Sequence, residues 1–323
     1  MNIELSTEAT DYGTAALRAF ESAGGDRLLE VAEVDPAGRH RALESVFAGL
    51  GAWDLNPRGD VDELEAAAAL CRSAGHWGIP YPVAERLAKP MDLDVDGLVV
   101  VADSGPAAAV AGLDLRWSAV SLSGLRSSVT VLPATESPRT SAFVAPLDLV
   151  PIDNGGATDL ALGLVLPCWT LLGMLDRALE LTRAHVLMRE QFGRPLAQLQ
   201  GVQFQLTDAE VERCGVEVLA KYALWSIEAG LDEAVDDALA LRLAAVEAAD
   251  VVFRVAHQLH GATGFCDETT LSWLSRYSLP LRRLPLGLAS TGAALTARVS
   301  RKGLTGLFGN APVAVSEPAA VIR

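Results

Sequence analysis

The sequence has few cysteines and histidines, the residues that cross-link small domains or bind metal ions. Its four cysteines are scattered over 323 residues, and no pair has the Cys-x-x-Cys spacing. This pattern excludes a zinc ribbon and argues against a disulfide framework, so we expect a reducing, cytoplasmic compartment. His257 and His260 lie three residues apart, but no acidic or sulfur partner follows at ligand spacing. We therefore expect no metal site.

Positive charge is also scarce. The chain has 26 lysines and arginines against 41 aspartates and glutamates, a formal net charge of −15. A field of this sign repels phosphate backbones, so we expect no nucleic-acid binding through a broad basic face. The same field repels an anionic ligand such as a coenzyme A ester, unless local arginines override it.

Long hydrophobic runs are missing as well. The N-terminus starts with an acidic segment that lacks an apolar signal core. The longest uncharged apolar stretch, residues 160–175, is shorter than the ~20 residues that cross a bilayer. We expect no membrane span and interpret this stretch as a buried helix. Two alternatives stay open for residues 160–175 and 246–259: both are central helices of a bundle, or part of their surface packs against neighbouring subunits.

Common catalytic signatures are absent too. The chain contains no GxGxxG, GxxxxGK[ST], HExxH or GxSxG sequence. The usual local signals of a dinucleotide-binding turn, a P-loop, a zinc protease and a serine hydrolase elbow are therefore missing.

The spacing of apolar residues changes twice along the chain, from helical to strand-like and back to helical. Apolar residues at helical spacing fill the first third, with helices predicted near residues 7–22, 39–50 and 60–75. Short β-branched segments follow at 97–102, 113–120, 129–132 and 141–144. Helices return at 158–188 (kinked or restarted at Pro167), 196–229, 233–260, 271–277 and 284–303. We predict an α+β fold that is mostly α: an N-terminal helical domain (1–90), a reduced antiparallel β domain (91–155), a C-terminal four-helix bundle (156–310) and a tail (311–323).

The junction between the first two bundle helices carries the most distinctive local sequence, from Arg189 to Leu196. One interpretation is a plain helix–helix turn, in which Gly193 stops one helix and Pro195 starts the next. The other is an anion site, because an arginine at a helix end and the amides of the next helix together suit a phosphate group. The residues alone leave both open.

This junction resembles that of acyl-CoA dehydrogenases, in which Arg-x-x-Phe-Gly-x-x-Leu is followed by a glutamine. A second segment runs from Gln258 through Gly261 to Gly264 and Phe265, with Glu268 and Arg276 downstream. It is similar to the family's Gln-x-x-Gly-Gly-x-Gly turn. The resemblance implies FAD bound across a subunit boundary. The implied contacts to the diphosphate and adenine half of the flavin are Arg189, Phe192, Gly193, Gln200, Gln258, Gly261 and Ala262.

The chain departs from that family at the catalytic base. Most members carry a glutamate shortly after the arginine that corresponds to Arg276, but residues 284–290 contain no acid. The family's alternative position falls at Gly163. Asp159, one helical turn earlier, is the nearest carboxylate and our candidate for a relocated base. Its other interpretation is an acid in the first turn of a helix, where it favours the helix dipole.

The resemblance therefore implies the short, base-less subunit of a heteromeric acyl-CoA dehydrogenase, of the kind that degrades steroid side chains. A catalytic partner subunit in an α2β2 heterotetramer would hold most of the acyl-CoA, and an electron-transfer flavoprotein would accept the electrons. Two alternatives stay open. The chain is a self-sufficient flavoenzyme that uses Asp159, or it is a scaffold protein without flavin.

Overall fold

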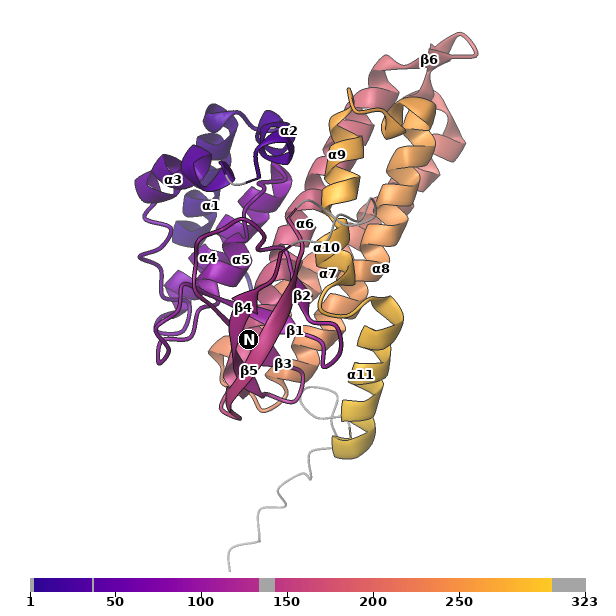
Figure 1. Cartoon of the computed structure of the whole chain (residues 1–323). Coiled ribbons are helices and arrows are strands. Elements are labelled where there is room, and N and C mark those ends of the chain that lie inside the picture. The colour runs from indigo at the N-terminus through magenta and orange to yellow at the C-terminus, as the bar shows by residue number, and fades with distance from the viewer. Residues whose placement is uncertain (1–2, 37, 134–142, 304–323) are drawn as a thin grey trace, which may run out of the picture.

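The computed structural model describes residues 3–36, 38–133 and 143–303 (Figure 1). The first part of the chain is helical, as predicted. Its helices are α1 (Thr7–Ala23), α2 (Arg27–Val34), α3 (Arg39–Gly49), α4 (Val61–His76) and α5 (Val83–Leu87). Local caps set two of the helix starts. The Ser6 hydroxyl accepts a hydrogen bond from the amide of Ala9, and the Asp60 carboxylate accepts one from the amide of Asp62.

A mixed sheet follows these helices. It is formed by β1 (Gly97–Val101), β2 (Ala107–Ala108), β3 (Trp117–Ser121), β4 (Arg126–Val131) and β5 (Ala145–Asp153), in the order β1-β3-β4-β5-β2. The expectation of a wholly antiparallel sheet is wrong, because β1 runs parallel to β3. Every residue of both strands is buried, so the strands show no in–out alternation. An apolar run of this kind carries no information on strand direction. Part of the predicted segment 141–144 lies outside the described residues.

The rest of the described chain is a helical bundle. Its long helices are α6 (Ala157–Met188), α7 (Gln200–Glu228) and α8 (Ala234–His260). The shorter α9 (Thr270–Tyr277), α10 (Leu279–Arg283) and α11 (Leu288–Lys302) follow, so the single helix predicted over 284–303 starts later than expected. α6 continues through Pro167, so the predicted restart is wrong, while the alternative of a kink stays a prediction. Gly230 and Gly261, both with φ of 62°, follow the ends of α7 and α8 as predicted. The predicted tail lies outside the described residues.

α6 is the central helix of the molecule and packs against α4 on one side and α8 on the other (Figure 1). The crossing with α4 depends on two glycines. A Cβ built on Gly75 would lie 1.9 Å from the carbonyl oxygen of Thr170, and one on Gly173 would lie 1.9 Å from that of Arg72. Because neither position has room for a side chain, the two helix backbones approach each other closely here.

The two apolar stretches are buried within this fold. α6 is long and apolar enough to span a membrane, but 83% of its most apolar window is buried inside the protein. The core also takes in Val246, Val252 and Phe253 of α8. The interpretation of both stretches as central helices is thus confirmed. The large apolar side chains that are exposed on the bundle lie elsewhere, chiefly on α7 and at the end of α6. The domain boundaries proposed above stay a prediction, since one continuous core runs through all three segments.

Candidate flavin-contact site and an apolar cavity

The junction between α6 and α7 folds as a small β-hairpin. Its strands are β6 (Glu190–Gln191) and β7 (Arg194–Pro195), and a single 3-10 turn, η1 (Leu196–Gln198), leads to α7. Phe192 and Gly193 form the two-residue loop with φ angles of 55° and 73°. Positive φ at both positions is typical of the tight turns that match strand twist. Of the two interpretations drawn from the sequence, the plain helix–helix turn is wrong in detail, because Gly193 shapes a hairpin and Pro195 belongs to its second strand.

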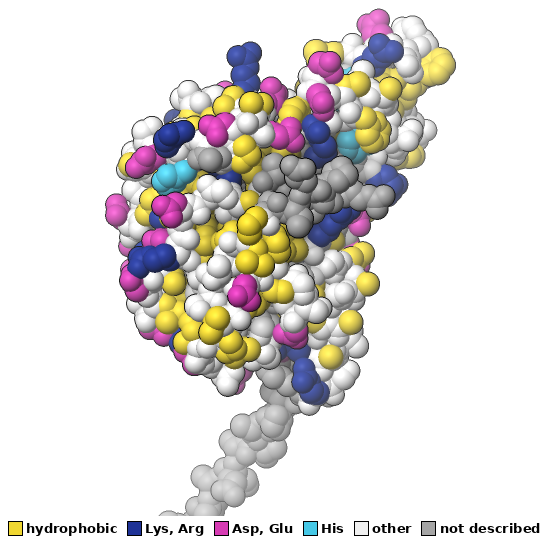
Figure 2. Space-filling model, viewed as in Figure 1, with side chains coloured by type: hydrophobic (Ala, Val, Ile, Leu, Met, Phe, Trp, Pro, Cys, Tyr) yellow, Lys and Arg dark blue, Asp and Glu magenta, His cyan; other side chains and the backbone are white. Residues whose placement is uncertain are grey.

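The hairpin presents its side chains to solvent. Phe192 is 86% exposed, and Arg189, Gly193 and Gln200 are also exposed. Among the described residues, no carboxylate pairs with the Arg189 guanidinium. Figure 2 shows hydrophobic side chains gathered at this protruding end of the bundle. An unpaired guanidinium beside an exposed aromatic ring suits a ligand that has both a phosphate and a flat ring.

The second predicted segment lies at the same end of the bundle as the first. Gln258 is exposed on the last turn of α8, and Gly261 and Ala262 are exposed at the start of a 3-10 turn, η2 (Gly261–Phe265). The helices that precede the two segments meet through the rings of His185 on α6 and His260 on α8, which stack with centroids 4.3 Å apart. The fold thus brings residues about 70 positions apart to one end of the bundle.

The histidines at this end favour their neutral forms. Burial lowers the pKa of His185, and the nearby positive charges of His260 and Arg189 lower it further. Burial also lowers the pKa of His260. A hydrogen bond of 2.8 Å between its Nδ1 and the Ala256 carbonyl partly offsets this shift by raising the pKa. The two imidazoles therefore add little positive charge at this end of the bundle near pH 7.

Asp159 lies elsewhere, in a buried ion-pair cluster. Its Oδ1 is 2.8 Å from Nη1 of Arg58, and its Oδ2 is 3.6 Å from Nη1 of Arg126. Arg58 also donates to the carbonyls of Ala88 and Lys89, while Arg126 pairs with Asp153 on β5. Burial raises the pKa of Asp159, and the two arginines oppose this shift. The placement supports a role in joining the N-terminal helices, the sheet and α6.

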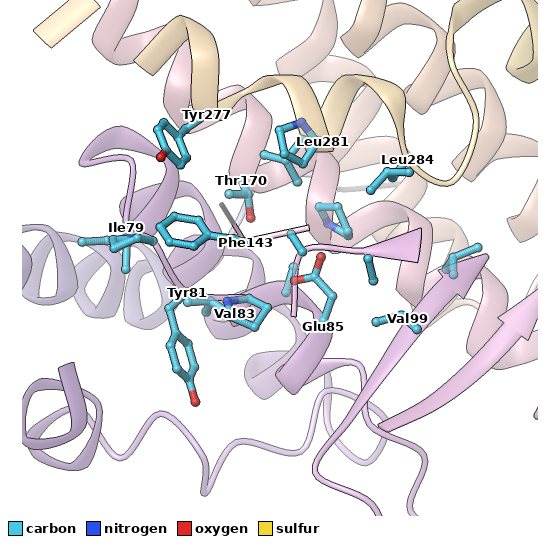
Figure 3. Close-up of a pocket in the computed structure, with 18 of the residues that line it drawn as sticks. Ile79, Tyr81, Val83, Glu85, Val99, Phe143, Thr170, Tyr277, Leu281 and Leu284 are labelled. Atoms are coloured by element: carbon cyan, nitrogen blue, oxygen red, sulfur yellow. The ribbon is translucent and has the colours of Figure 1, made fainter. Parts of the chain in front are cut away.

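An apolar cavity of about 110 Å³ lies between the three parts of the chain (Figure 3). Its walls include Ile79 before α5, Val99 on β1, Thr170 on α6, and Leu281 and Leu284 from the α10 region. Asp159 is not part of the lining. Of the described residues that line the cavity, Glu85 on α5 is the only one with a carboxylate. Burial raises the pKa of Glu85 to about 7.

Glu85 was missed by the sequence analysis. The available signal was an acid on a five-residue amphipathic segment directly after the Gly-Ile-Pro-Tyr-Pro sequence that starts at Gly78. Nothing in that pattern shows that Glu85 faces the inside of the protein.

Among the described residues, no group of three or more histidine, cysteine or acidic side chains is arranged to hold a metal ion.

Comparison with known proteins agrees with this architecture. Residues 158–284 match the family model of the acyl-CoA dehydrogenase C-terminal domain. In the ChsE4-ChsE5 complex from Mycobacterium tuberculosis, one chain aligns with a TM-score of 0.72 at 17% identity, over 94% of this chain and 100% of that one. A chain of the Tcur3481-Tcur3483 steroid ACAD G363A variant aligns with a TM-score of 0.75 at 20% identity, over 91% and 98%. The chain has the acyl-CoA dehydrogenase fold.

The matches to curated acyl-CoA dehydrogenase relatives are shorter. Acyl-CoA dehydrogenase FadE28 of Mycobacterium tuberculosis is 34% identical over 92 residues, 28% of this chain and 27% of that protein. The 3-sulfinopropanoyl-CoA desulfinase of Paraburkholderia xenovorans is 27% identical over 248 residues, 71% of this chain and 58% of that protein. The chain thus spans between about a quarter and three fifths of the length of these relatives.

Gly163, where the resemblance to acyl-CoA dehydrogenases implies an alternative base, and part of the acid-free segment 284–290 border the cavity. Gly163 lines it, as do Leu284 and Pro285 from the acid-free segment. A Cβ built on Gly163 would lie 2.7 Å from Cγ2 of Val100 on β1. The close approach of β1 to α6 therefore leaves no room for an acidic side chain at residue 163.

Proposed function

We propose that this chain is a subunit of a heteromeric, FAD-dependent acyl-CoA dehydrogenase and that it supplies part of the FAD site without supplying the base. The reaction of the complex is α,β-dehydrogenation of an acyl-CoA, and a steroid side-chain CoA ester is the substrate class that we favour. The observation that carries the proposal is the unpaired Arg189 beside the exposed Phe192, at the end of the bundle that also presents Gln258.

The residues present fit one half of FAD. The planar guanidinium of Arg189 suits the diphosphate through its fixed fork of donors. Phe192 suits packing against the adenine, and Gln200 and Gln258 have amide groups for hydrogen bonds. When bound, FAD supplies the redox chemistry of the reaction by accepting a hydride. The net charge of −15 makes a local cation at this place more necessary for an anionic ligand.

A partner chain completes the site in this proposal. It brings the base and most of the acyl-CoA pocket, in an assembly that we expect to be an α2β2 heterotetramer, and an electron-transfer flavoprotein takes up the electrons. The exposed apolar side chains at the hairpin end, Leu187, Met188 and Phe192, support a partner at this surface.

The test compares two arginine variants in the assembled complex. Arg189→Ala removes a charge-assisted contact worth about 1.5–3 kcal/mol, so the dissociation constant of FAD should rise roughly ten- to a hundredfold. Arg194→Ala removes an equally exposed arginine on the other strand of the hairpin and should change it little. The measurement is FAD per heterodimer together with the dissociation constant. Full, equal occupancy in both variants would contradict the cross-subunit site.

A second candidate function is a self-sufficient flavoenzyme, and the carboxylate of Glu85 inside the cavity favours it more than Asp159 does. Absorbance near 450 nm separates the candidates when the chain is produced alone and with an acyl-CoA dehydrogenase-like partner. Flavin colour only with the partner supports the heteromeric subunit, and colour in the isolated chain supports the self-sufficient enzyme. No colour in either sample supports a scaffold.

A further inference from the structure

We propose that the cavity bordered by α5, α6, β1 and α10 binds a small uncharged molecule, or the end of one, that has an apolar body and a single hydroxyl group, and that the carboxyl of Glu85 holds the hydroxyl. This assignment concerns the cavity alone and does not depend on the flavin contacts of Arg189. It assigns no bond breaking to Glu85.

The position of Glu85 carries the argument. Figure 3 shows its carboxyl directed into the space between Val99, Thr170 and Leu281. The Glu85 carboxyl accepts a hydrogen bond from its own backbone amide, but among the described residues it has no ion pair and no side-chain hydrogen bond to another residue, so its remaining lone pairs face the cavity. The adjacent Arg86 is turned away, because its guanidinium stacks on Trp53 at 4.0 Å and donates to the hydroxyl of Tyr81. A carboxyl left in an apolar cavity needs a hydrogen-bond partner from a ligand or from water.

Most other polar groups of the lining are already bonded. The Tyr277 hydroxyl donates to Oε1 of Glu33 at 2.7 Å, and the Thr170 hydroxyl bonds the Leu166 carbonyl at 3.4 Å. The two terminal nitrogens of Arg242 donate to the carbonyls of Leu281, Leu284 and Leu286. Two side-chain groups among the described residues of the lining have no partner in another residue: the Glu85 carboxyl, which accepts hydrogen bonds, and the Nε of Arg242, a buried donor.

Besides the Glu85 carboxyl, the backbone carbonyl of Gly163 is free to accept a hydrogen bond. Gly163 and Pro167 both line the cavity, and they are four residues apart on α6. Because Pro167 has no N–H, the Gly163 carbonyl lacks its usual helical hydrogen bond. The wall formed by α6 therefore carries a second acceptor besides the Glu85 carboxyl, which suits a ligand that donates a hydrogen bond.

The size of the cavity limits the ligand. A cavity of roughly 150 Å³ lined by apolar side chains holds one benzene molecule. The cavity of about 110 Å³ is smaller, so on the same scale it encloses about four or five non-hydrogen atoms, which suits one end of a slightly larger molecule. A small cyclic or branched alcohol fits this volume.

The titratable groups around Glu85 determine how ligand binding in the cavity responds to pH. The titratable groups near it are Cys71 on α4, Arg242 on α8, and the phenols of Tyr81 and Tyr277. Burial raises the pKa of the Cys71 thiol and of both phenols, so these groups stay neutral near pH 7. Burial lowers the pKa of Arg242, whose guanidinium faces carbonyl oxygens. Glu85, with its pKa near 7, is the group that changes charge there.

Ionisation should weaken binding of an uncharged ligand. The carboxylate form of Glu85 attracts several water molecules, and one ligand hydroxyl replaces them incompletely. The affinity for an alcohol should therefore fall as the pH rises from 6 to 8. Glu85→Gln, which cannot ionise, should bind with an affinity that is independent of pH over this range.

The experiment titrates the full chain with cyclopentanol and with cyclopentane, observed by saturation-transfer NMR. Glu85→Leu keeps the approximate volume and removes the acceptor, so the dissociation constant of cyclopentanol should rise about tenfold while that of cyclopentane does not rise. Glu44→Gln, on the exposed face of α3, is the matched control and should change neither. Leu281→Trp fills the cavity and should abolish binding of both molecules.

Three results would overturn the proposal. The first is cyclopentanol binding that Glu85→Leu leaves unchanged, and the second is binding that survives Leu281→Trp. The third is butyryl-pantetheine binding more tightly than cyclopentanol and equally well to Glu85→Leu, which would assign the cavity to a thioester acyl chain. Loss of FAD in the Arg189→Ala complex leaves these titrations unaffected, so the two proposals fail separately.

Discussion

The imidazole rings of His185 and His260 stack with centroids 4.3 Å apart and planes 23° apart. This contact joins the last turn of α6 to the last turn of α8, and these turns directly precede the two exposed segments proposed to contact FAD. Each ring is followed closely by one of those segments: the hairpin begins after Arg189, and the η2 turn begins at Gly261.

The stacked pair predicts an acid-sensitive fold. The pKa values of His185 and His260 are lowered in the folded chain, so the unfolded chain binds more protons around pH 6. The stability from the neutral rings is fully present above about pH 6.5 and is lost as the pH falls below it. Denaturant unfolding at pH 7.5 and 5.5 should show this loss. The lowered pKa values of His76 and His257 act in the same direction.

A variant isolates the contribution of the pair. His260→Phe keeps an aromatic ring against His185 but cannot be protonated, so the loss of stability between pH 7.5 and 5.5 should become smaller. His40→Phe, in the N-terminal helices, serves as the comparison. An unchanged pH dependence in His260→Phe would show that the stacked pair does not control acid sensitivity.

Asp159→Asn should reduce stability more than activity. The change leaves Arg58 with a neutral partner in a buried place, which we expect to cost about 1–3 kcal/mol. Because Asp159 does not line the cavity, turnover of the assembled complex should stay within a few-fold. Asp148→Asn, on an exposed position of β5, is the control for both measurements. A fall in turnover of ~10²–10⁴ with full flavin content would instead identify Asp159 as a general base.

Gly173→Ala should destabilise the chain strongly. The new Cβ would lie 1.9 Å from the Arg72 carbonyl oxygen, so α4 and α6 must move apart, and we expect a loss of about 3 kcal/mol or more. Gly215→Ala is a matched change within α7, where nothing lies within 4 Å of the new Cβ. It should raise stability by about 0.5–1 kcal/mol through helix propensity. Equal effects of the two variants on the urea midpoint would argue against the close crossing of α4 and α6.

Gly193→Val tests the shape of the hairpin. A β-branched residue at a φ of 73° is strained by about 1–2 kcal/mol, so the loop should change conformation and move Phe192. We expect weaker FAD binding by the complex, with little change in the unfolding midpoint because the hairpin is exposed. Gly201→Ala, at an open position early in α7, should leave both quantities close to those of the parent. Retention of full FAD affinity by Gly193→Val would exclude a role for the hairpin shape.

The sequence by itself determined the long helices and the order of helices, sheet and bundle, because the signals are local, whereas α2, β2 and the β6–β7 hairpin were not predicted. Helical periodicity and the glycines at 230 and 261 placed α7 and α8 within a few residues of their observed bounds. The segments around Arg189 and Gln258 were enough for the resemblance to acyl-CoA dehydrogenases. Each of these inferences depends on neighbouring residues, which the printed order of the chain contains.

Only the tertiary structure decided which distant side chains meet. The parallel pairing of β1 with β3, the ion pair of Asp159 with Arg58 and the contact of His185 with His260 join residues 20 to 101 positions apart. The cavity that contains the Glu85 carboxyl also depends on tertiary structure, since the cavity walls come from α5, β1, α6 and α10. Burial and charge at such places arise from packing between elements, and packing is a property of the folded chain that local sequence patterns do not contain.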